Sequence, residues 1–295
     1  MIENDEQAKN AIIENIEMYN KSEDAKKLLT IILRLCEKYS FVENQTYPRP
    51  SHPIEEKRKD PYYTLIAIIL SLRTTLENEK KAVRAFMDKY KSISEVLNAD
   101  ENEMIEVIKV AGMPQKKAQT IIKLSEYIQK YYNGNIWNAK QESVSKTREE
   151  LVKMPGVGDK SADCMLELGF DMPSMVVDIN VFRVASRIFR EKWAENPDFT
   201  NKEQIKAVKD RLENSLPRDY LTYQIAHTMI LLQGKHICKS KCKCENCFIT
   251  DCCNFYKEKL DDVYVTWKEF MKDAKNYKGD GVLDTEYEPN TPAVI

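Results

Sequence analysis

Glycine and long apolar runs are both scarce in this chain. Of its 295 residues only 8 are glycine. Gly112, Gly156 and Gly158 fall where tight turns are predicted. No apolar run approaches the length that a membrane-spanning helix needs, and no apolar targeting segment follows Met1. The composition therefore favours helices, with glycine kept for turns, and it predicts an intracellular protein without a membrane anchor.

The chain also lacks an excess of basic residues, and its formal net charge is −2. A DNA-binding protein needs a local basic face rather than a basic total, so this value excludes nothing. The segment from Gly234 to Cys244 contains four lysines and no acidic residue. This lysine-rich segment is a candidate for phosphate contacts, although a charge run is often only a solvated face.

The stretch from Leu151 to Cys164, LVKMPGVGDKSADC, predicts two helices joined by a tight turn. Pro155 ends the first helix, and Gly156 and Gly158 allow a sharp reversal that leaves backbone amides exposed. Free amides at the start of a helix form an anion site that suits a phosphate group. Lys160 lies in the first turn of the second helix.

Asp178 follows the apolar run Met175–Val177 and precedes the apolar positions of another predicted helix. It is therefore expected to cap that helix. A lysine beside a glycine turn is usually a solvated surface group, and an aspartate before a helix is usually only a cap. The order and spacing of Lys160 and Asp178 together are far more specific than either residue alone.

Capping signals predict where several other helices begin. Asp60 followed by Pro61 precedes the apolar run Leu65–Leu70, which should form a central helix. Three pairs with capping-box spacing predict further helix starts: Asp100 with Glu103, Thr147 with Glu150, and Thr200 with Glu203.

Six of the eight cysteines lie close together near residue 250. Without a secretion signal, so many cysteines point to a metal or cluster site rather than to disulfides. Thiolates at short spacings can surround a soft metal centre without a regular element. From the cysteines alone, an iron–sulfur cluster and a structural zinc site stay equally open. The six are Cys238, Cys242, Cys244, Cys247, Cys252 and Cys253.

Two stretches together resemble the helix-hairpin-helix and Gly/Pro-Asp core of the endonuclease III superfamily of DNA glycosylases. They are MPGVGDK, from Met154 to Lys160, and VDINV, from Val177 to Val181. The resemblance covers about residues 28–257. It implies a protein that acts on double-stranded DNA containing a damaged or mismatched base and flips the target nucleotide into a pocket. We expect the protein to be a monomer.

The resemblance also implies an all-α fold of two helical domains. One is a six-helix barrel whose helix-hairpin-helix occupies about residues 146–170. The other combines N- and C-terminal parts of the chain and carries a [4Fe-4S] cluster loop. The implied boundaries are 1–54 for the N-terminal segment, which partly joins the cluster domain, 55–172 for the barrel, 173–260 for the cluster domain and 261–295 for a mobile extension.

In this family the residue at the place of Lys160 is the nucleophile, and the aspartate at the place of Asp178 is essential. The resemblance therefore implies that Lys160 forms a Schiff base with the sugar, helped by a helix N-terminus and partial burial. Asp178 would stabilise positive charge on the sugar and help to activate the lysine.

The implied DNA contacts come from three places. The hairpin turn would hold phosphate, and the lysine-rich segment would contact the backbone. Arg73 would fill the gap left by the flipped base, and Met113 would act as an apolar wedge unless it is simply a core residue. The other residues of this set are Pro155, Gly156, Val157, Gly158, Lys239, Lys241 and Lys243.

The last three ligands of the family's cluster match Cys244, Cys247 and Cys253. The first ligand usually stands one residue further away than Cys238 does, so Cys238 is the expected ligand and Cys242 the reserve candidate. Cys252 is left over. With the hairpin upstream, a [4Fe-4S] cluster is favoured, and zinc is the main alternative.

The implied activity is base excision repair by a glycosylase with AP-lyase activity, which removes a damaged pyrimidine. Leu76 replaces an aspartate of typical pyrimidine-oxidation enzymes, Asn180 replaces a common histidine, and Asp159 puts an acid beside the phosphate site. Leu72–Thr75 is similar to the matching stretch of thymine-mismatch glycosylases. The alternatives are a monofunctional glycosylase for T or U mismatches and a non-catalytic helix-hairpin-helix protein.

Overall fold

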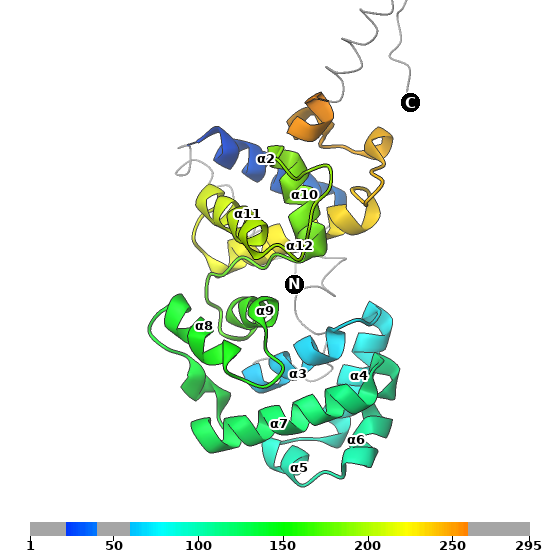
Figure 1. Ribbon diagram of the computed structural model, residues 1–295, viewed down its shortest axis with the longest axis vertical. Helices are drawn as coiled ribbons and strands as arrows, with labels where there is room; N and C mark the ends of the chain where they lie inside the picture. The colour runs from blue at the N-terminus through cyan, green and yellow to red at the C-terminus, as the bar shows by residue number, and fades with distance from the viewer. Residues whose placement is uncertain (1–21, 40–59, 259–295) are drawn as a thin grey trace, which may run out of the picture.

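A computed structural model describes residues 22–39 and 60–258 (Figure 1). Within these ranges every regular element is an α-helix or a 3-10 helix, which confirms the all-α prediction. None of the described helices is long and apolar enough to span a bilayer. The proposed N-terminal segment is described only in part, and the proposed C-terminal extension lies outside the described residues.

The lower part of the molecule in Figure 1 is built around α3 (Pro61–Ser71). Every residue of this helix up to Leu70 is buried, which confirms that the apolar run Leu65–Leu70 is central. The helices that share its hydrophobic core are α4 (Leu76–Lys89), α5 (Ile93–Leu97), α6 (Glu101–Ile108), α7 (Pro114–Tyr132), α8 (Val144–Val152) and α9 (Asp159–Gly169), with the 3-10 helices η2 (Lys109–Ala111) and η3 (Ile136–Ala139).

A second hydrophobic core lies in the upper part of Figure 1. The two cores meet within residues 175–177, where Val176 belongs to the first core and Met175 and Val177 belong to the second, which also includes the N-terminal helix. We propose that these two cores correspond to the two domains. The elements of the second core are α2 (Glu23–Tyr39), α10 (Ile179–Phe189), α11 (Lys202–Ser215) and α12 (Tyr220–His236), followed by the 3-10 helices η4 (Cys244–Asn246) and η5 (Thr250–Cys252).

Two predicted helix starts are confirmed. The side chain of Asp60 accepts a hydrogen bond from the Tyr62 amide at 2.9 Å, and Pro61 is the first residue of α3. Asp100 caps α6 by accepting a hydrogen bond from the Glu103 amide at 3.0 Å.

Two other predicted caps are wrong. The hairpin helix α8 begins earlier, at Ser143, whose hydroxyl accepts from the Lys146 amide, whereas Thr147 is buried inside the helix and donates to the Ser143 carbonyl at 2.9 Å. Helix α11 is capped by Asn201 rather than Thr200. In both places neighbouring residues also have capping side chains, and burial of the helix face selects among them.

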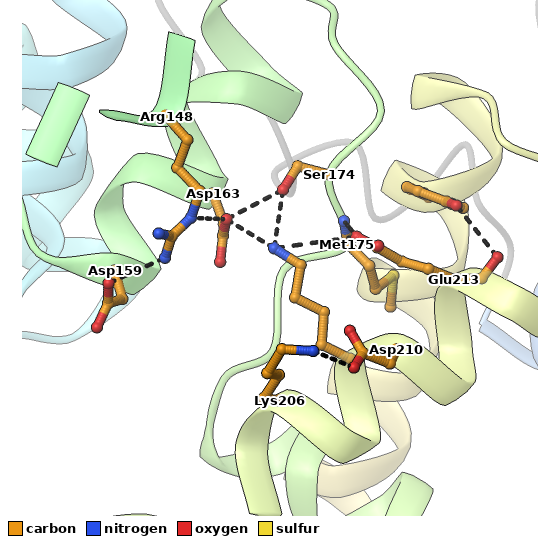
Figure 2. Close-up of polar contacts among 10 residues, drawn as sticks. Arg148, Asp159, Asp163, Ser174, Met175, Lys206, Asp210 and Glu213 are labelled. Carbon is orange, nitrogen blue, oxygen red and sulfur yellow. Dashed lines mark hydrogen bonds and ion pairs between the residues drawn. The ribbon is translucent and has the colours of Figure 1, made fainter. Parts of the chain in front are cut away.

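A polar network joins the hairpin to α11 across the boundary between the two cores (Figure 2). Asp163 of α9 is at its centre, with a side chain only 10% exposed. Its Oδ1 accepts from Lys209 at 2.7 Å, from Arg148 at 3.1 Å and from Ser174 at 3.0 Å. Loss of these partners would leave a buried charge uncompensated, which is strongly destabilising. The network therefore fixes the position of the hairpin against the second core.

Candidate active site

The predicted hairpin is formed by α8, a tight turn and α9. Gly156 has φ +82°, and a Cβ there would lie 2.2 Å from the Thr120 methyl of α7, so this position requires glycine. Val157 is buried, whereas Gly156 and Gly158 are exposed. Gly158 caps α9 without any side-chain hydrogen bond, and the first amides of that helix are therefore available to an anion.

Asp159 does not place an uncompensated negative charge at this anion site. Its carboxylate accepts from Arg148 at 3.0 Å and pairs with Lys202 at 3.3 Å (Figure 2 shows the Arg148 contact). The hydrogen bond from Arg148 is the main cause that lowers the pKa of Asp159. The acid beside the phosphate site is thus neutralised by two cations, neither of which the sequence pattern identified.

Lys160 lies in the first turn of α9 and is exposed. Within the described residues its Nζ forms no hydrogen bond and no ion pair, so the amine can move toward a substrate. The expected partial burial of this side chain is wrong. At the edge of the hairpin turn, the described part of the protein does not cover the Lys160 side chain.

Asp178 is buried, with 8% of its surface exposed, and it caps α10 as predicted. Its Oδ1 accepts from the amides of Asn180 and Val181, both at 2.8 Å. Its Oδ2 accepts from the side-chain amide of Asn180 at 3.1 Å. Asn180 therefore orients the carboxylate through two separate hydrogen bonds.

Lys160 and Asp178 both lie within electrostatic reach of Cys164. This thiol is buried in α9, burial raises its pKa to about 12, and both Lys160 and Asp178 act on it electrostatically. A Cβ on Gly234 of α12 would lie 2.7 Å from the Cβ of Asn180, in the first turn of α10. This close approach fixes the start of α10, and the sequence reasoning missed it.

Arg73 and Met113 lie on neighbouring turns. Both have left-handed backbone conformations, with φ 52° and φ 50°, which are uncommon for residues other than glycine and often occur at functional sites. The Arg73 carbonyl lies 3.9 Å from the Cβ position of Gly112, and Lys117 bridges the two turns by donating to the carbonyls of Leu70 and Ala111 at 2.8 and 2.7 Å. Met113 is 40% exposed, so its alternative interpretation as a core residue is wrong.

All eight cysteines are free thiols. Five of the six clustered cysteines line one pocket, and Cys252 is the exception. The other walls are mostly apolar, and burial raises the pKa of Cys244 to about 12 and that of Cys253 to about 11. Buried thiolates need a compensating positive centre, so this donor set fits a metal cluster. The five are Cys238, Cys242, Cys244, Cys247 and Cys253.

Two arginines of α10 hold this cysteine loop, and the sequence reasoning missed both. Arg183 donates to the carbonyls of Cys238 at 2.8 Å and Gly234 at 3.0 Å. Arg187 donates to the carbonyls of Lys239 at 2.6 Å and Ser240 at 2.9 Å. Their i, i+4 spacing on the helix that Asp178 begins was the available signal.

The site combines a glycine hairpin with free helix-start amides, an exposed lysine in the helix that follows, and a buried aspartate that caps a third helix. In a comparison with known families, the family described as HhH-GPD superfamily base excision DNA repair protein matches residues 66–209. Endonuclease III of Thermotoga maritima is 33% identical over 70% of this chain and 89% of that protein. Endonuclease III of Escherichia coli K12 is 28% identical over 71% of this chain and 91% of that protein.

Two solved structures show the same fold. One is a trapped endonuclease III–DNA covalent intermediate, with TM-score 0.62, 22% identity and coverage of 80% of this chain and 98% of that chain. The other is a thermostable thymine-DNA glycosylase, with TM-score 0.61, 24% identity and coverage of 79% and 98%. The chain belongs to the HhH-GPD superfamily of base excision DNA repair proteins and, within it, to the endonuclease III family. It is a DNA glycosylase with AP-lyase activity.

Proposed function

We propose that the protein removes a damaged pyrimidine from duplex DNA through a Schiff base on Lys160. The observation that carries this proposal is the exposed amine of Lys160 in the first turn of α9, which has no partner among the described residues and acts electrostatically on the same thiol, Cys164, as the buried carboxylate of Asp178. A primary amine can form an imine with the sugar carbon, and a fixed carboxylate stabilises the positive charge that develops as the base leaves.

Duplex DNA would be held by contacts that do not read its sequence. The free amides of the hairpin and the exposed side chains of Lys239, Lys241 and Lys243 would meet phosphate groups. Arg73 and Met113, exposed on their adjoining turns, would enter the space left by the flipped nucleotide. We expect a monomer to suffice, and the intracellular location remains a prediction.

The cysteine pocket would hold a [4Fe-4S] cluster. When bound, the cluster supplies a positive centre that organises the loop. Cys244, Cys247 and Cys253 are the expected ligands together with Cys238, whose Sγ also accepts from Arg187 at 3.3 Å. Cys242 also lines the pocket and remains the reserve candidate, whereas Cys252 lies outside it.

Borohydride trapping tests the role of Lys160. The wild-type protein should form a covalent complex with a duplex that carries one oxidised pyrimidine, and Lys160→Gln should abolish this complex. Because the hairpin amides remain, Lys160→Gln should still bind duplex DNA. Asp178→Asn should slow base release strongly, by about 10²-fold or more, because the developing cation loses its carboxylate.

Three outcomes separate this proposal from its rivals. Trapping that persists in Lys160→Gln would place the nucleophile elsewhere. Base release without trapping in the wild type would favour the monofunctional mismatch glycosylase, in which water attacks under the direction of Asp178. Binding without any base release on oxidised or mismatched duplexes would favour the non-catalytic protein.

A further inference from the structure

Lys117 of α7 is a buried lysine that bridges the two chain segments leading to Arg73 and Met113. Only 4% of its surface is exposed. Its Nζ donates to the Leu70 carbonyl at 2.8 Å and to the Ala111 carbonyl at 2.7 Å. Its backbone amide also donates to the Met113 carbonyl at 3.1 Å. One residue therefore ties both segments to α7 through three hydrogen bonds.

Both acceptors of the Lys117 ammonium lie at the ends of helices. Leu70 is in the last turn of α3, and Ala111 is the last residue of η2. The last carbonyls of a helix have no amide partner within it, and they favour a positive charge. A single ammonium group therefore satisfies two helix ends at once, which holds these ends at a fixed separation.

The burial of this ammonium makes its two carbonyl partners necessary. Burial lowers the pKa of Lys117, and the carboxylate of Glu79 on α4 opposes this effect. A buried charge is costly unless hydrogen bonds compensate it. The side chain is therefore held between the two helix ends and cannot leave one of them without a loss of free energy.

The turns that follow these helix ends have strained backbones and lie close together. Arg73 and Met113 have left-handed conformations, with φ 52° and φ 50°. Such a conformation persists in a residue other than glycine only where the surrounding structure holds it. The Arg73 carbonyl lies 3.9 Å from the Cβ position of Gly112, so the two turns also approach each other. The hydrogen bonds of Lys117 are contacts of the kind that can hold this pair of turns.

The side chains of Arg73 and Met113 are both exposed. Within the described residues, Arg73 forms no side-chain hydrogen bond and no ion pair. The position of each side chain is therefore set by the backbone of its turn. Two side chains that enter one gap in a duplex need a fixed separation, because small displacements of positioning groups are costly.

We propose that Lys117 is a positioning residue that places Arg73 and Met113 as one unit, so that both side chains enter the duplex together when the target nucleotide is flipped. The inference rests on the insertion roles proposed above for these two residues. Lys117 itself is buried and acts only through the two turns. Without its ammonium group, the turns would move independently and would support the opened duplex less well.

The test compares two substrates. One is a duplex with one oxidised pyrimidine, on which base release is measured. The other is a single strand with one abasic site, on which borohydride trapping is measured. The duplex has a base stack to open and a gap to fill, whereas the single strand has neither.

Lys117→Met removes the ammonium group and keeps most of the apolar stem. Lys116→Met is the matched control, because Lys116 is the preceding residue of α7, is exposed and loses the same charge. On the duplex, Lys117→Met should release the base up to about 10²-fold more slowly than Lys116→Met, the loss that a displacement of about 1 Å can cause. On the single strand, the two variants should trap at similar rates. A purely structural role would slow both substrates alike.

Lys117→Arg, which keeps a cation and its donors, should recover part of the duplex rate. A double-mutant cycle then tests whether Lys117 acts through the two exposed side chains. Arg73→Ala and Met113→Ala should each slow base release in the wild-type background but should add little in the Lys117→Met background. Losses that multiply instead would mean that Lys117 acts independently of both side chains, which contradicts the inference.

Equal duplex rates for Lys117→Met and Lys116→Met would overturn the inference and leave the Schiff base on Lys160 in place. Wild-type rates in both Arg73→Ala and Met113→Ala would refute the insertion roles as well. A wild type that neither releases the base nor is trapped would refute the proposed function itself. Should Lys117→Met fail to fold, Lys117→Gln replaces it. Its shorter side chain must weaken at least one of the two bridges, so an unchanged duplex rate would decide against the inference.

Discussion

Asp178 serves the fold and the chemistry with the same two oxygens. The capping bonds from Asn180 and Val181 fix its carboxylate at the start of α10, within electrostatic reach of the same thiol as Lys160. A capping aspartate can be read from sequence because the motif is local. Its burial, and its placement opposite α9, depend on helices far apart in the chain.

Glu79 provides a test of stability at the scale of one residue. Its pKa is raised on folding, so the stability that it contributes is fully present below pH 4.5 and is lost as the pH rises through about 6. Above that pH the buried charge should cost about 2 kcal/mol. Glu79→Gln should therefore be more stable than the wild type by up to about this amount at pH 8, with no gain at pH 4.

Urea unfolding of both proteins at the two pH values measures this difference. Glu77→Gln, whose side chain is exposed, is the control and should show no comparable gain. A Glu79→Gln protein that is less stable than the wild type at pH 8 would contradict the burial argument.

At the scale of elements, the hairpin depends on Gly156 more than on Gly158. Gly156→Ala would place a Cβ 2.2 Å from the Thr120 methyl at φ +82°, which should destabilise the protein by about 2–4 kcal/mol. The same change at Gly158 meets nothing within 4 Å and should alter stability by less than about 0.5 kcal/mol. Thermal unfolding of the two variants checks the contrast, and similar losses in both would refute it.

The cysteine loop is an element that has almost no regular structure of its own. It consists of short 3-10 turns, and α10 holds it through Arg183 and Arg187. The family resemblance implied its ligands, and they stay a prediction. The dependence on α10 could not be predicted, because backbone carbonyls are acceptors that no residue pattern identifies.

At the scale of the whole molecule, binding of the cluster should stabilise the second core against unfolding and not only order the loop, because the loop, α10 and α12 share that core. Cys244→Ser should contain less iron than the wild type and unfold at a lower temperature. Cys252→Ser, outside the pocket, should keep its iron. Iron and zinc analysis with visible absorbance measures this, and stoichiometric zinc without iron in the wild type would contradict the assignment.

The two cores are joined by polar contacts that only the assembled molecule shows. Asp163 links the hairpin to Lys209 of α11 (Figure 2), and Gln224 of α12 donates to the Glu167 carbonyl of α9 at 2.8 Å. These contacts hold α9, which carries Lys160, against the core that contains α10, which Asp178 caps. A site shared between two bodies needs such contacts, since a small rotation would separate its residues.

The sequence by itself determined what depends on neighbours along the chain. Helix periodicity, the Gly156 turn, the cap at Asp178 and the cysteine spacing are all local, so single helices and the family resemblance could be read from them, and the resemblance implied the all-α fold. Tertiary structure decided which side chains are buried and which charges are compensated. It capped α8 at Ser143, exposed Lys160 and paired Asp159 with Arg148 and Lys202. The burial and the electrostatic environment of a side chain depend on residues that are distant in sequence, so patterns of neighbouring residues do not predict them.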